Sequence, residues 1–312
     1  MKVLAYAGND DIAKVYIAEF ENGKKVEFVE STQPPIPFEK KWVLIVSNMF
    51  GCPIKCRFCD AGGKYGGKLT RNEIISQIDY LVKSKGFEKS IPIEKFKIQF
   101  ARMGEPALNE EVLEVLKMLP SIYDAPGLLP SVSTIAPEST DTFFKRLLCI
   151  KNSVYGNNFQ FQFSVHTTDE ELRNWLIPVK KWSFDKMAEY GENFFNKGDR
   201  KITLNFALAQ GMPLDTDVLL KHFDPEKFLL KITPVNPTYN AINNNIKSEL
   251  INQESLSDVI DNAKKSPYEV IVSIGELEEN NIGSNCGQYI NTLNNNCVKP
   301  ENSYTYEVKN IN

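Results

Sequence analysis

The chain has 312 residues, 42% of them hydrophobic and 24% charged, and a net charge of −4. This length allows one large α/β barrel or two smaller domains. Apolar runs are shorter than a membrane span, and the N-terminus lacks a signal-peptide pattern, so we expect a cytoplasmic protein with no membrane partner. The excess of acidic over basic residues argues against a protein whose main role is to bind nucleic acid.

The first part of the chain predicts a small β structure. Segments 14–20 and 24–30 are rich in Val, Ile, Tyr and Phe, and Asn22-Gly23 between them favours a tight hairpin turn. The proline-rich stretch 33–37 then interrupts regular structure. We therefore expect a small β-hairpin appendage over residues 1–40.

From Trp42 onward, strand, loop and helix patterns alternate. Strands are predicted for 43–47, 95–100, 131–135, 159–165, 202–208, 229–234 and 268–274. Helices are predicted for 71–83, 110–118, 139–148, 255–264 and from Asp169, the first with a capping box of Thr70 and Glu73. About six βα units predict an α/β fold, a partial (βα)6 TIM-like barrel over 41–290, followed by a polar tail over 291–312. Chemistry is then expected at the carboxyl ends of the strands.

The loop after the first buried strand holds three closely spaced cysteines, Cys52, Cys56 and Cys59. Thiolates suit iron–sulfur clusters, and three of them leave one iron of a four-iron cluster open to a small molecule. A zinc knuckle would need a fourth Cys or His nearby, and the next cysteine is Cys149, predicted to lie in the core at the end of an apolar helix. Chance spacing is the other alternative. The pattern favours a [4Fe-4S] cluster.

This spacing, with Phe58 just before Cys59, resembles the radical S-adenosylmethionine (SAM) superfamily. Within it, the chain resembles the RlmN/Cfr family of methyl synthases, which methylate adenine carbons in RNA. The matching stretches are 51–59, 69–77, 103–106, 132–134, 164–166, 171–178, 234–237 and 286–288. The resemblance implies that SAM binds the open iron. One electron from a reductant such as flavodoxin or ferredoxin would then split SAM into methionine and a 5′-deoxyadenosyl radical.

The resemblance also assigns side chains to SAM. Gly104 and Glu105 would hold the SAM amino group, because glycine lets the backbone approach and a carboxylate accepts from an ammonium. The SAM carboxylate and ribose would be bound by Ser133, Ser164, His166 and Asn236, with Phe58 beside the cluster. Each has an ordinary alternative, namely a strand-end serine, a helix-entry acid, a turn cap or, for His166, a buried histidine satisfied by backbone.

Two further residues would carry the methyl-synthase chemistry of the resembling family. Cys286, in Cys286-Gly287-Gln288, would take a methyl group from one SAM, and the radical from a second SAM would abstract hydrogen from it. The methyl carbon would then add to an sp2 carbon, and Glu27 would remove the substrate proton, unless Glu27 is merely an exposed hairpin residue. Cys297 is the sole cysteine of the tail, where the family's resolving cysteine would be sought, but its setting matches no family motif.

The charge of the segment before Cys286 differs from that of the family. Where the family carries Arg or Lys before the terminal cysteine, this chain has Glu276, Glu278 and Glu279, which would repel phosphates. The helical RNA-binding module common in the ribosomal enzymes is also expected to be absent, because the sequence begins with the β appendage. We expect a monomeric radical SAM methyltransferase acting on an sp2 carbon, with RNA adenine a candidate and ribosomal RNA disfavoured. The alternatives are a divergent radical SAM enzyme acting on a small molecule or a protein, and an iron–sulfur sensor without turnover.

Overall fold

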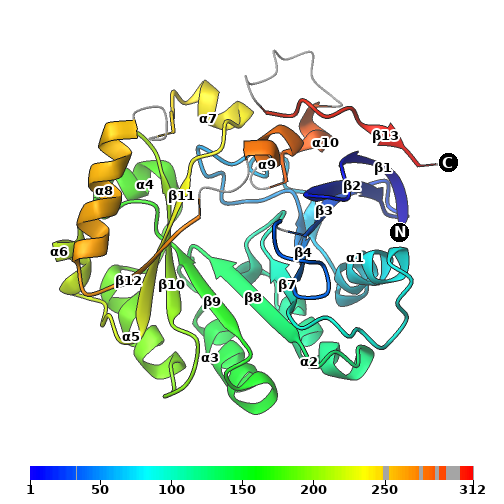
Figure 1. Cartoon of the computed structure of the whole chain (residues 1–312), viewed down its shortest axis with the longest axis horizontal. Helices are drawn as coiled ribbons and strands as arrows, with labels where there is room; N and C mark the ends of the chain where they lie inside the picture. The colour runs from blue at the N-terminus through cyan, green and yellow to red at the C-terminus, as the bar shows by residue number, and fades with distance from the viewer. Residues whose placement is uncertain (33, 249–252, 274–276, 285–287, 293–302, 312) are drawn as a thin grey trace.

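The centre of the protein is an 11-stranded sheet with the order β12-β11-β10-β9-β8-β7-β4-β3-β2-β1-β13. The computed structural model describes residues 1–32, 34–248, 253–273, 277–284, 288–292 and 303–311. The parallel strands are β4 (Trp42–Val46), β7 (Phe96–Phe100), β8 (Leu128–Thr134), β9 (Gln160–Ser164), β10 (Ile202–Leu208), β11 (Phe228–Pro234) and β12 (Glu269–Val272). The sheet curves into an arc (Figure 1). The predicted α/β fold with a large parallel sheet is confirmed.

Three N-terminal strands extend this sheet. Strands β1 (Lys2–Gly8), β2 (Ala13–Glu19) and β3 (Lys25–Ser31) are antiparallel, and β3 pairs with β4. The sequence predicts the hairpin of β2 and β3 but not β1. The short strand β13 (Lys309–Asn310) pairs with β1, so part of the C-terminal tail lies on the same sheet. The division of the chain into domains stays a prediction.

Helices line the outer side of the arc (Figure 1). Helix α1 (Arg71–Ser84) begins with the predicted capping box, because the Thr70 hydroxyl accepts from the Glu73 N–H and the Glu73 carboxylate accepts from the Thr70 N–H. The sequence also predicts α2 (Glu111–Ile122), α3 (Asp141–Ile150), α4 (Glu170–Leu176) and α8 (Gln253–Lys265), but not α5 (Phe184–Phe194) or α6 (Thr216–Leu220). Among the described helices, none combines the length and apolarity needed to cross a membrane.

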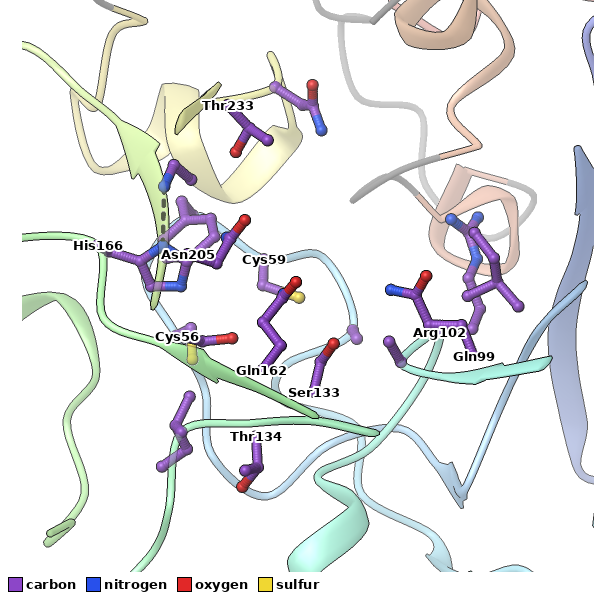
Figure 2. Close-up of a pocket in the computed structure, with 18 of the residues that line it drawn as sticks. Cys56, Cys59, Gln99, Arg102, Ser133, Thr134, Gln162, His166, Asn205 and Thr233 are labelled. Atoms are coloured by element: carbon purple, nitrogen blue, oxygen red, sulfur yellow. Dashed lines mark hydrogen bonds between the residues drawn. The ribbon is translucent and has the colours of Figure 1, made fainter. Parts of the chain in front are cut away.

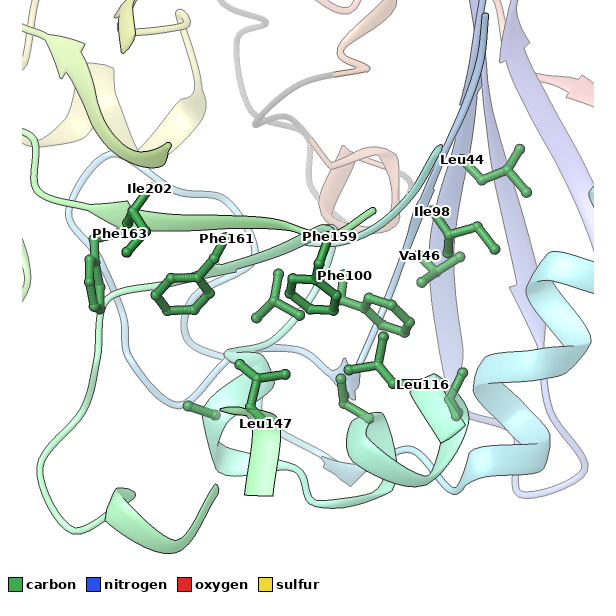
Figure 3. Close-up of a cluster of buried hydrophobic side chains, with 14 of the residues drawn as sticks. Leu44, Val46, Ile98, Phe100, Leu116, Leu147, Phe159, Phe161, Phe163 and Ile202 are labelled. Atoms are coloured by element: carbon green, nitrogen blue, oxygen red, sulfur yellow. The ribbon is translucent and has the colours of Figure 1, made fainter. Parts of the chain in front are cut away.

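The main hydrophobic core lies between the strands and the outer helices (Figure 3). Ile98 and Phe100 of β7 are fully buried in the same cluster as Leu116 of α2. Lys97 and Gln99 alternate with them, and both line a cavity on the other face of the sheet. Strand β7 therefore presents polar side chains to a cavity on the inner face of the arc.

Cys149 is exposed, so the prediction that it lies in the core is wrong. The buried residues of α3 are Phe143, Phe144, Leu147 and Ile150. Because residues three and four apart share a helix face, Cys149 falls beside this stripe rather than within it. The position of Cys149 on the helix surface, and not its apolar neighbours in the sequence, determines that this thiol is exposed.

Candidate functional site

A cavity of about 320 Å³ lies on the inner face of the sheet and reaches the carboxyl ends of the parallel strands. Its lining includes the three clustered cysteines and all of the predicted SAM contacts, namely Phe58, Gly104, Glu105, Ser133, Ser164, His166 and Asn236. Figure 2 shows Cys56 and Cys59 on a loop facing Ser133 and Gln162 of neighbouring strands. Residues far apart in the sequence therefore meet at one place, as expected at the ends of parallel strands.

The cysteine loop follows β5 (Met49–Phe50) and is closed by backbone hydrogen bonds. The Cys59 N–H donates to the Cys56 carbonyl at 3.1 Å, and the Gly63 N–H donates to the Cys52 carbonyl at 3.3 Å. Burial raises the pKa of Cys52 to about 11, and burial together with its two neighbouring cysteines raises the pKa of Cys56. Three thiolates gathered here therefore need positive charge beside them.

Thiolates are the ligands that iron–sulfur clusters use. Within the described ranges, no group of three or more His, Cys, Asp or Glu side chains is arranged to hold one metal ion. A cubane takes each thiolate on a different iron, so its ligands lie apart from one another around one cavity. Three half-buried thiols lining a common cavity match that requirement.

Glu105 provides a buried carboxylate in the same cavity. It accepts hydrogen bonds from the Ala107 N–H at 3.0 Å, the Ile135 N–H at 3.1 Å and the Thr134 hydroxyl. Burial nevertheless raises the pKa of Glu105 to about 7. It forms no ion pair with the described part of the chain. A buried carboxylate of this kind fits the α-ammonium group of SAM.

The pH dependence of SAM binding follows from Glu105. Below pH 7 the carboxyl must release its proton before it can pair with the SAM ammonium, so SAM affinity should rise about tenfold per pH unit up to about 7 and then level off. Glu105→Gln should abolish this slope and weaken binding about tenfold or more at pH 8. Calorimetric titration of the cluster-loaded protein measures both effects. The exposed Glu138→Gln should bind like wild type, and an unchanged slope in Glu105→Gln would contradict the assignment.

Gly104 brings the backbone close to the cysteine-loop side of the cavity. Its φ is +98°, and a Cβ atom there would lie 2.6 Å from the Cβ of Met49. Gly104→Ala should therefore lower the free energy of unfolding by about 2–3 kcal/mol, because strain and crowding add. Gly198, with φ +95° and open space within 4 Å of where a Cβ atom would lie, isolates the strain, and Gly198→Ala should cost about 1 kcal/mol. Urea unfolding compares the two variants, and equal losses would show that crowding at Met49 is absent.

Ser133 and His166 offer hydrogen-bond donors to the cavity. The buried Ser133 hydroxyl has no hydrogen-bond partner among the described residues. Nδ1 of His166 accepts from the Ala207 N–H at 3.1 Å (Figure 2), which assigns the ring proton to Nε2. Burial, with a smaller effect from Arg173, lowers the pKa of His166 to about 3, so the ring is neutral. A backbone N–H therefore satisfies His166 at Nδ1, as the alternative interpretation expected, and the Nε2–H can donate to a ligand.

Residues after β11 support the cysteine loop from the far side of the cavity. Asn236 lies two residues beyond β11, and Ser164 is the last residue of β9. The Thr238 hydroxyl donates to the Phe58 carbonyl at 2.7 Å, and the Asn240 side chain donates to the Cys59 carbonyl at 2.8 Å. The segment carrying Asn236 and the loop carrying the cysteines are thus fixed to each other.

The chain is similar in sequence to curated proteins, although no family model matches it. The probable dual-specificity RNA methyltransferase RlmN of Prochlorococcus marinus is 28% identical over 231 residues, covering 72% of this chain and 61% of that protein. The protein of the same name from Chlorobium phaeobacteroides is 27% identical over 260 residues, covering 76% and 63%. The chain therefore spans about three fifths of the length of these relatives.

A solved structure shares the fold over nearly the whole chain. A radical SAM methyltransferase from Sphaerobacter thermophilus aligns with a TM-score of 0.67 and 20% identity, covering 92% of this chain and 81% of that one. The chain is a relative of the RlmN/Cfr-like radical SAM proteins. A mutant of spore photoproduct lyase aligns less closely, with a TM-score of 0.52 and 12% identity over 73% of this chain and 75% of that chain.

In the present chain, Cys286 and Cys297 lie outside the described residues, so their roles stay predictions. The chain on the N-terminal side of Cys286 is described. Arg102, which lines the cavity, donates to the carbonyls of Gly283 at 3.1 Å and Ser284 at 2.9 Å. The residues that lead into the Cys286 segment are therefore held beside the cavity.

The chain on the C-terminal side of Cys286 is held by a second buried network. The Gln288 N–H donates to the Tyr304 hydroxyl at 3.0 Å. The Tyr304 hydroxyl in turn donates to Asp60, the residue after Cys59. Asp60 also accepts from the backbone of Asn240 at 2.9 Å. Both flanks of Cys286 are thus tied to residues next to the cavity.

Glu27 is fully buried in β3 and lies outside the lining of the cavity. Its carboxylate pairs with Arg102 at 2.7 Å and accepts from the Ile290 N–H at 2.7 Å. Burial raises the pKa of Glu27, whereas Arg102 and the Ile290 N–H act in the opposite direction. The alternative of an exposed hairpin residue is therefore wrong. These contacts connect β3 to Arg102 and to Ile290, which follows Cys286 in the chain, and the role of Glu27 as a base stays a prediction.

Several cavity residues are absent from the sequence-based prediction. Arg102 adjoins a predicted motif, and Lys97, Gln162 and Lys231 lie on the inner face of the strands. The available signal was a period of two, since polar residues alternate with buried apolar ones in β7, β9 and β11. Polar residues inside a strand run point to a ligand-facing surface when both faces of the sheet are covered.

Proposed function

We propose that the protein holds a [4Fe-4S] cluster and SAM in this cavity and cleaves SAM reductively. The observation that carries the proposal is the meeting of Cys52, Cys56 and Cys59 with the buried carboxylate of Glu105 in one cavity. The three thiolates would hold the cluster, which when bound supplies the electron for the cleavage. An external reductant such as flavodoxin or ferredoxin would deliver that electron.

The side chains of the cavity would orient SAM. Glu105 would accept from the SAM ammonium, and the Ser133 hydroxyl and His166 Nε2–H would donate to its carboxylate or ribose oxygens. Ser164 and Asn236 line the same space and would complete these contacts. Because His166 is neutral at physiological pH, it would add no charge beside the sulfonium.

We further infer that the enzyme is a methyltransferase in which Cys286 receives a methyl group from one SAM and passes its carbon to an sp2 carbon. Two observations support this: the curated relatives are named as RNA methyltransferases, and both flanks of Cys286 are tied beside the cavity. An RNA adenine is the acceptor that those names suggest. A small molecule or a protein is the alternative acceptor.

The test is anaerobic incubation of the cluster-loaded full chain with SAM that carries a deuterated methyl group. Peptide mass spectrometry should find that group on Cys286 with an equal amount of S-adenosylhomocysteine, and the Cys286→Ala variant should form neither. Unmodified Cys286, with 5′-deoxyadenosine still formed once a reductant is added to the same sample, would overturn the methyl step alone. It would leave a radical SAM enzyme with a different outcome.

A further inference from the structure

We propose that two cations behind the cysteine loop, Arg173 and Lys181, offset the negative charge of a bound cluster and thereby raise its reduction potential. The proposal rests on the proposed function, because it assigns residues of this chain a role toward the cluster of the same cavity. Neither cation lines that cavity, so both would act through their charge and not by contact with SAM.

The segment that follows α4 packs against the cysteine loop. The Arg57 N–H, next to Cys56, donates to the carbonyl of Leu176 at 2.9 Å. Ile177 is buried in a small hydrophobic cluster, and the half-buried Cys56 packs against the same cluster. The residues after α4 are therefore fixed directly behind the thiol loop.

Lys181 folds its side chain back over this segment. Its ammonium group donates to the Asn174 side chain at 2.6 Å and to the carbonyls of Ile177 at 3.0 Å and Val179 at 3.2 Å. All three acceptors are uncharged, so they fix the ammonium group without cancelling its charge. Lys181 thus holds a positive charge at the segment that touches the cysteine loop.

Arg173, on α4, is a second cation in the same region. It is buried, its guanidinium donates to the Trp182 carbonyl at 2.9 Å, and it lies over the ring of Phe184 at 5.1 Å. Its Nε atom is buried without a hydrogen-bond partner among the described residues. Within the described part of the chain, Arg173 and Lys181 form no ion pair, and the exposed Glu170 is the one carboxylate that acts on either of them.

The charges of these groups act on one another. Burial, with a smaller effect from Arg173, lowers the pKa of Lys181 to about 8, although the Cys56 thiolate acts in the opposite direction. Burial lowers the pKa of Arg173 to about 10, although Glu170 opposes it. Both groups therefore carry a positive charge at neutral pH, and Lys181 lies near enough to Cys56 for their charges to interact.

A cluster held by three thiolates needs such charges. Its oxidised core is dipositive, so three thiolates leave the assembly anionic, and reduction adds a further negative charge. Positive charge in a partly buried setting stabilises the reduced form more than the oxidised form. The net charge around a cluster is one of the factors that set its reduction potential. Arg173 and Lys181 should therefore ease electron transfer from the flavodoxin or ferredoxin of the proposed function.

The experiment is an anaerobic redox titration of the cluster-loaded full chain, in which electron paramagnetic resonance measures the reduced cluster. Lys181→Met should shift the reduction equilibrium about tenfold toward the oxidised form, a fall of about 59 mV in the midpoint potential of a one-electron couple. Lys181→Arg keeps the charge and should stay within about twofold of wild type. Arg173→Met should shift the equilibrium in the same direction as Lys181→Met.

Lys180→Met is the matched control, because it removes the same charge from an exposed neighbouring position. Water and salt screen that charge, so the shift should be less than about threefold. The proposal is overturned if Lys181→Met keeps the wild-type potential at wild-type iron content, or if Lys180→Met shifts the potential equally.

The titration also separates this proposal from the proposed function. A wild-type cluster that is reduced but does not cleave SAM would overturn the proposed function and leave the effect of Lys181→Met on the potential unchanged. A wild-type chain that retains no cluster would overturn both.

Discussion

Replacing Cys56 with serine is expected to lower reductive SAM cleavage by three orders of magnitude or more, roughly 4 kcal/mol in activation free energy. Cys56 is one of three thiols that line the cavity, and a serine hydroxyl is a poor ligand for the iron of a cluster. The variant should also lose most of its iron and sulfide. Iron analysis after anaerobic reconstitution and quantification of 5′-deoxyadenosine measure the two effects.

Cys149→Ser is the matched control, because this cysteine is exposed on α3 and lies outside the lining of the cavity. It should keep wild-type iron content and SAM cleavage. Full cleavage by Cys56→Ser, or an equal loss in Cys149→Ser, would show that the thiol loop does not hold the cluster. Both variants carry the same chemical change, so general effects of serine cancel.

Replacing Arg102 with methionine is expected to lower the free energy of unfolding by about 3–5 kcal/mol. The Arg102 and Glu27 side chains are only 1% and 0% exposed, so the substitution leaves a carboxylate buried without its cation. It also removes the donors to the Gly283 and Ser284 carbonyls. Methylation of Cys286 should therefore fall in the folded fraction of the variant. Urea unfolding and peptide mass spectrometry measure the two losses.

The exposed pair of Lys40 and Glu94 provides the comparison, with side chains 58% and 63% exposed. Lys40→Met should cost less than about 1 kcal/mol, since water solvates the remaining carboxylate. The double variant Glu27→Gln with Arg102→Met should recover part of the stability lost by Arg102→Met, because the buried charge is gone. A loss below about 1 kcal/mol for Arg102→Met alone would mean that the buried pair does not stabilise the fold.

Local sequence patterns predicted most of the helices and strands. They failed where contacts between elements determine whether a helix forms or a side chain is buried. The helix α5 contains Gly191, which weakens a helical pattern. A Cβ atom at Gly191 would lie 2.2 Å from the ring of Phe228 on β11, so the glycine permits close packing of helix on strand. That contact could not be read from α5 alone. The exposure of Cys149 likewise depends on the face of α3 that meets the sheet.

The predicted SAM contacts come from motifs at strand ends, which the parallel sheet brings together. The residues that contact the described chain before and after Cys286 could not be predicted in this way. Glu27 and Arg102 are 75 positions apart, and Asp60 and Tyr304 are 244 apart. Nothing in the residue types or their spacing in the sequence identifies either pair, and only the fold brings the two members into contact.

Reduction of the cluster-loaded wild-type protein in the presence of SAM tests the central claim most directly. We predict 5′-deoxyadenosine and methionine in equal amounts, formed only when both SAM and the reductant are present. Calorimetry on the same sample should confirm that SAM is bound. Bound SAM on an intact, reduced cluster without 5′-deoxyadenosine would contradict the claim that this cavity cleaves SAM.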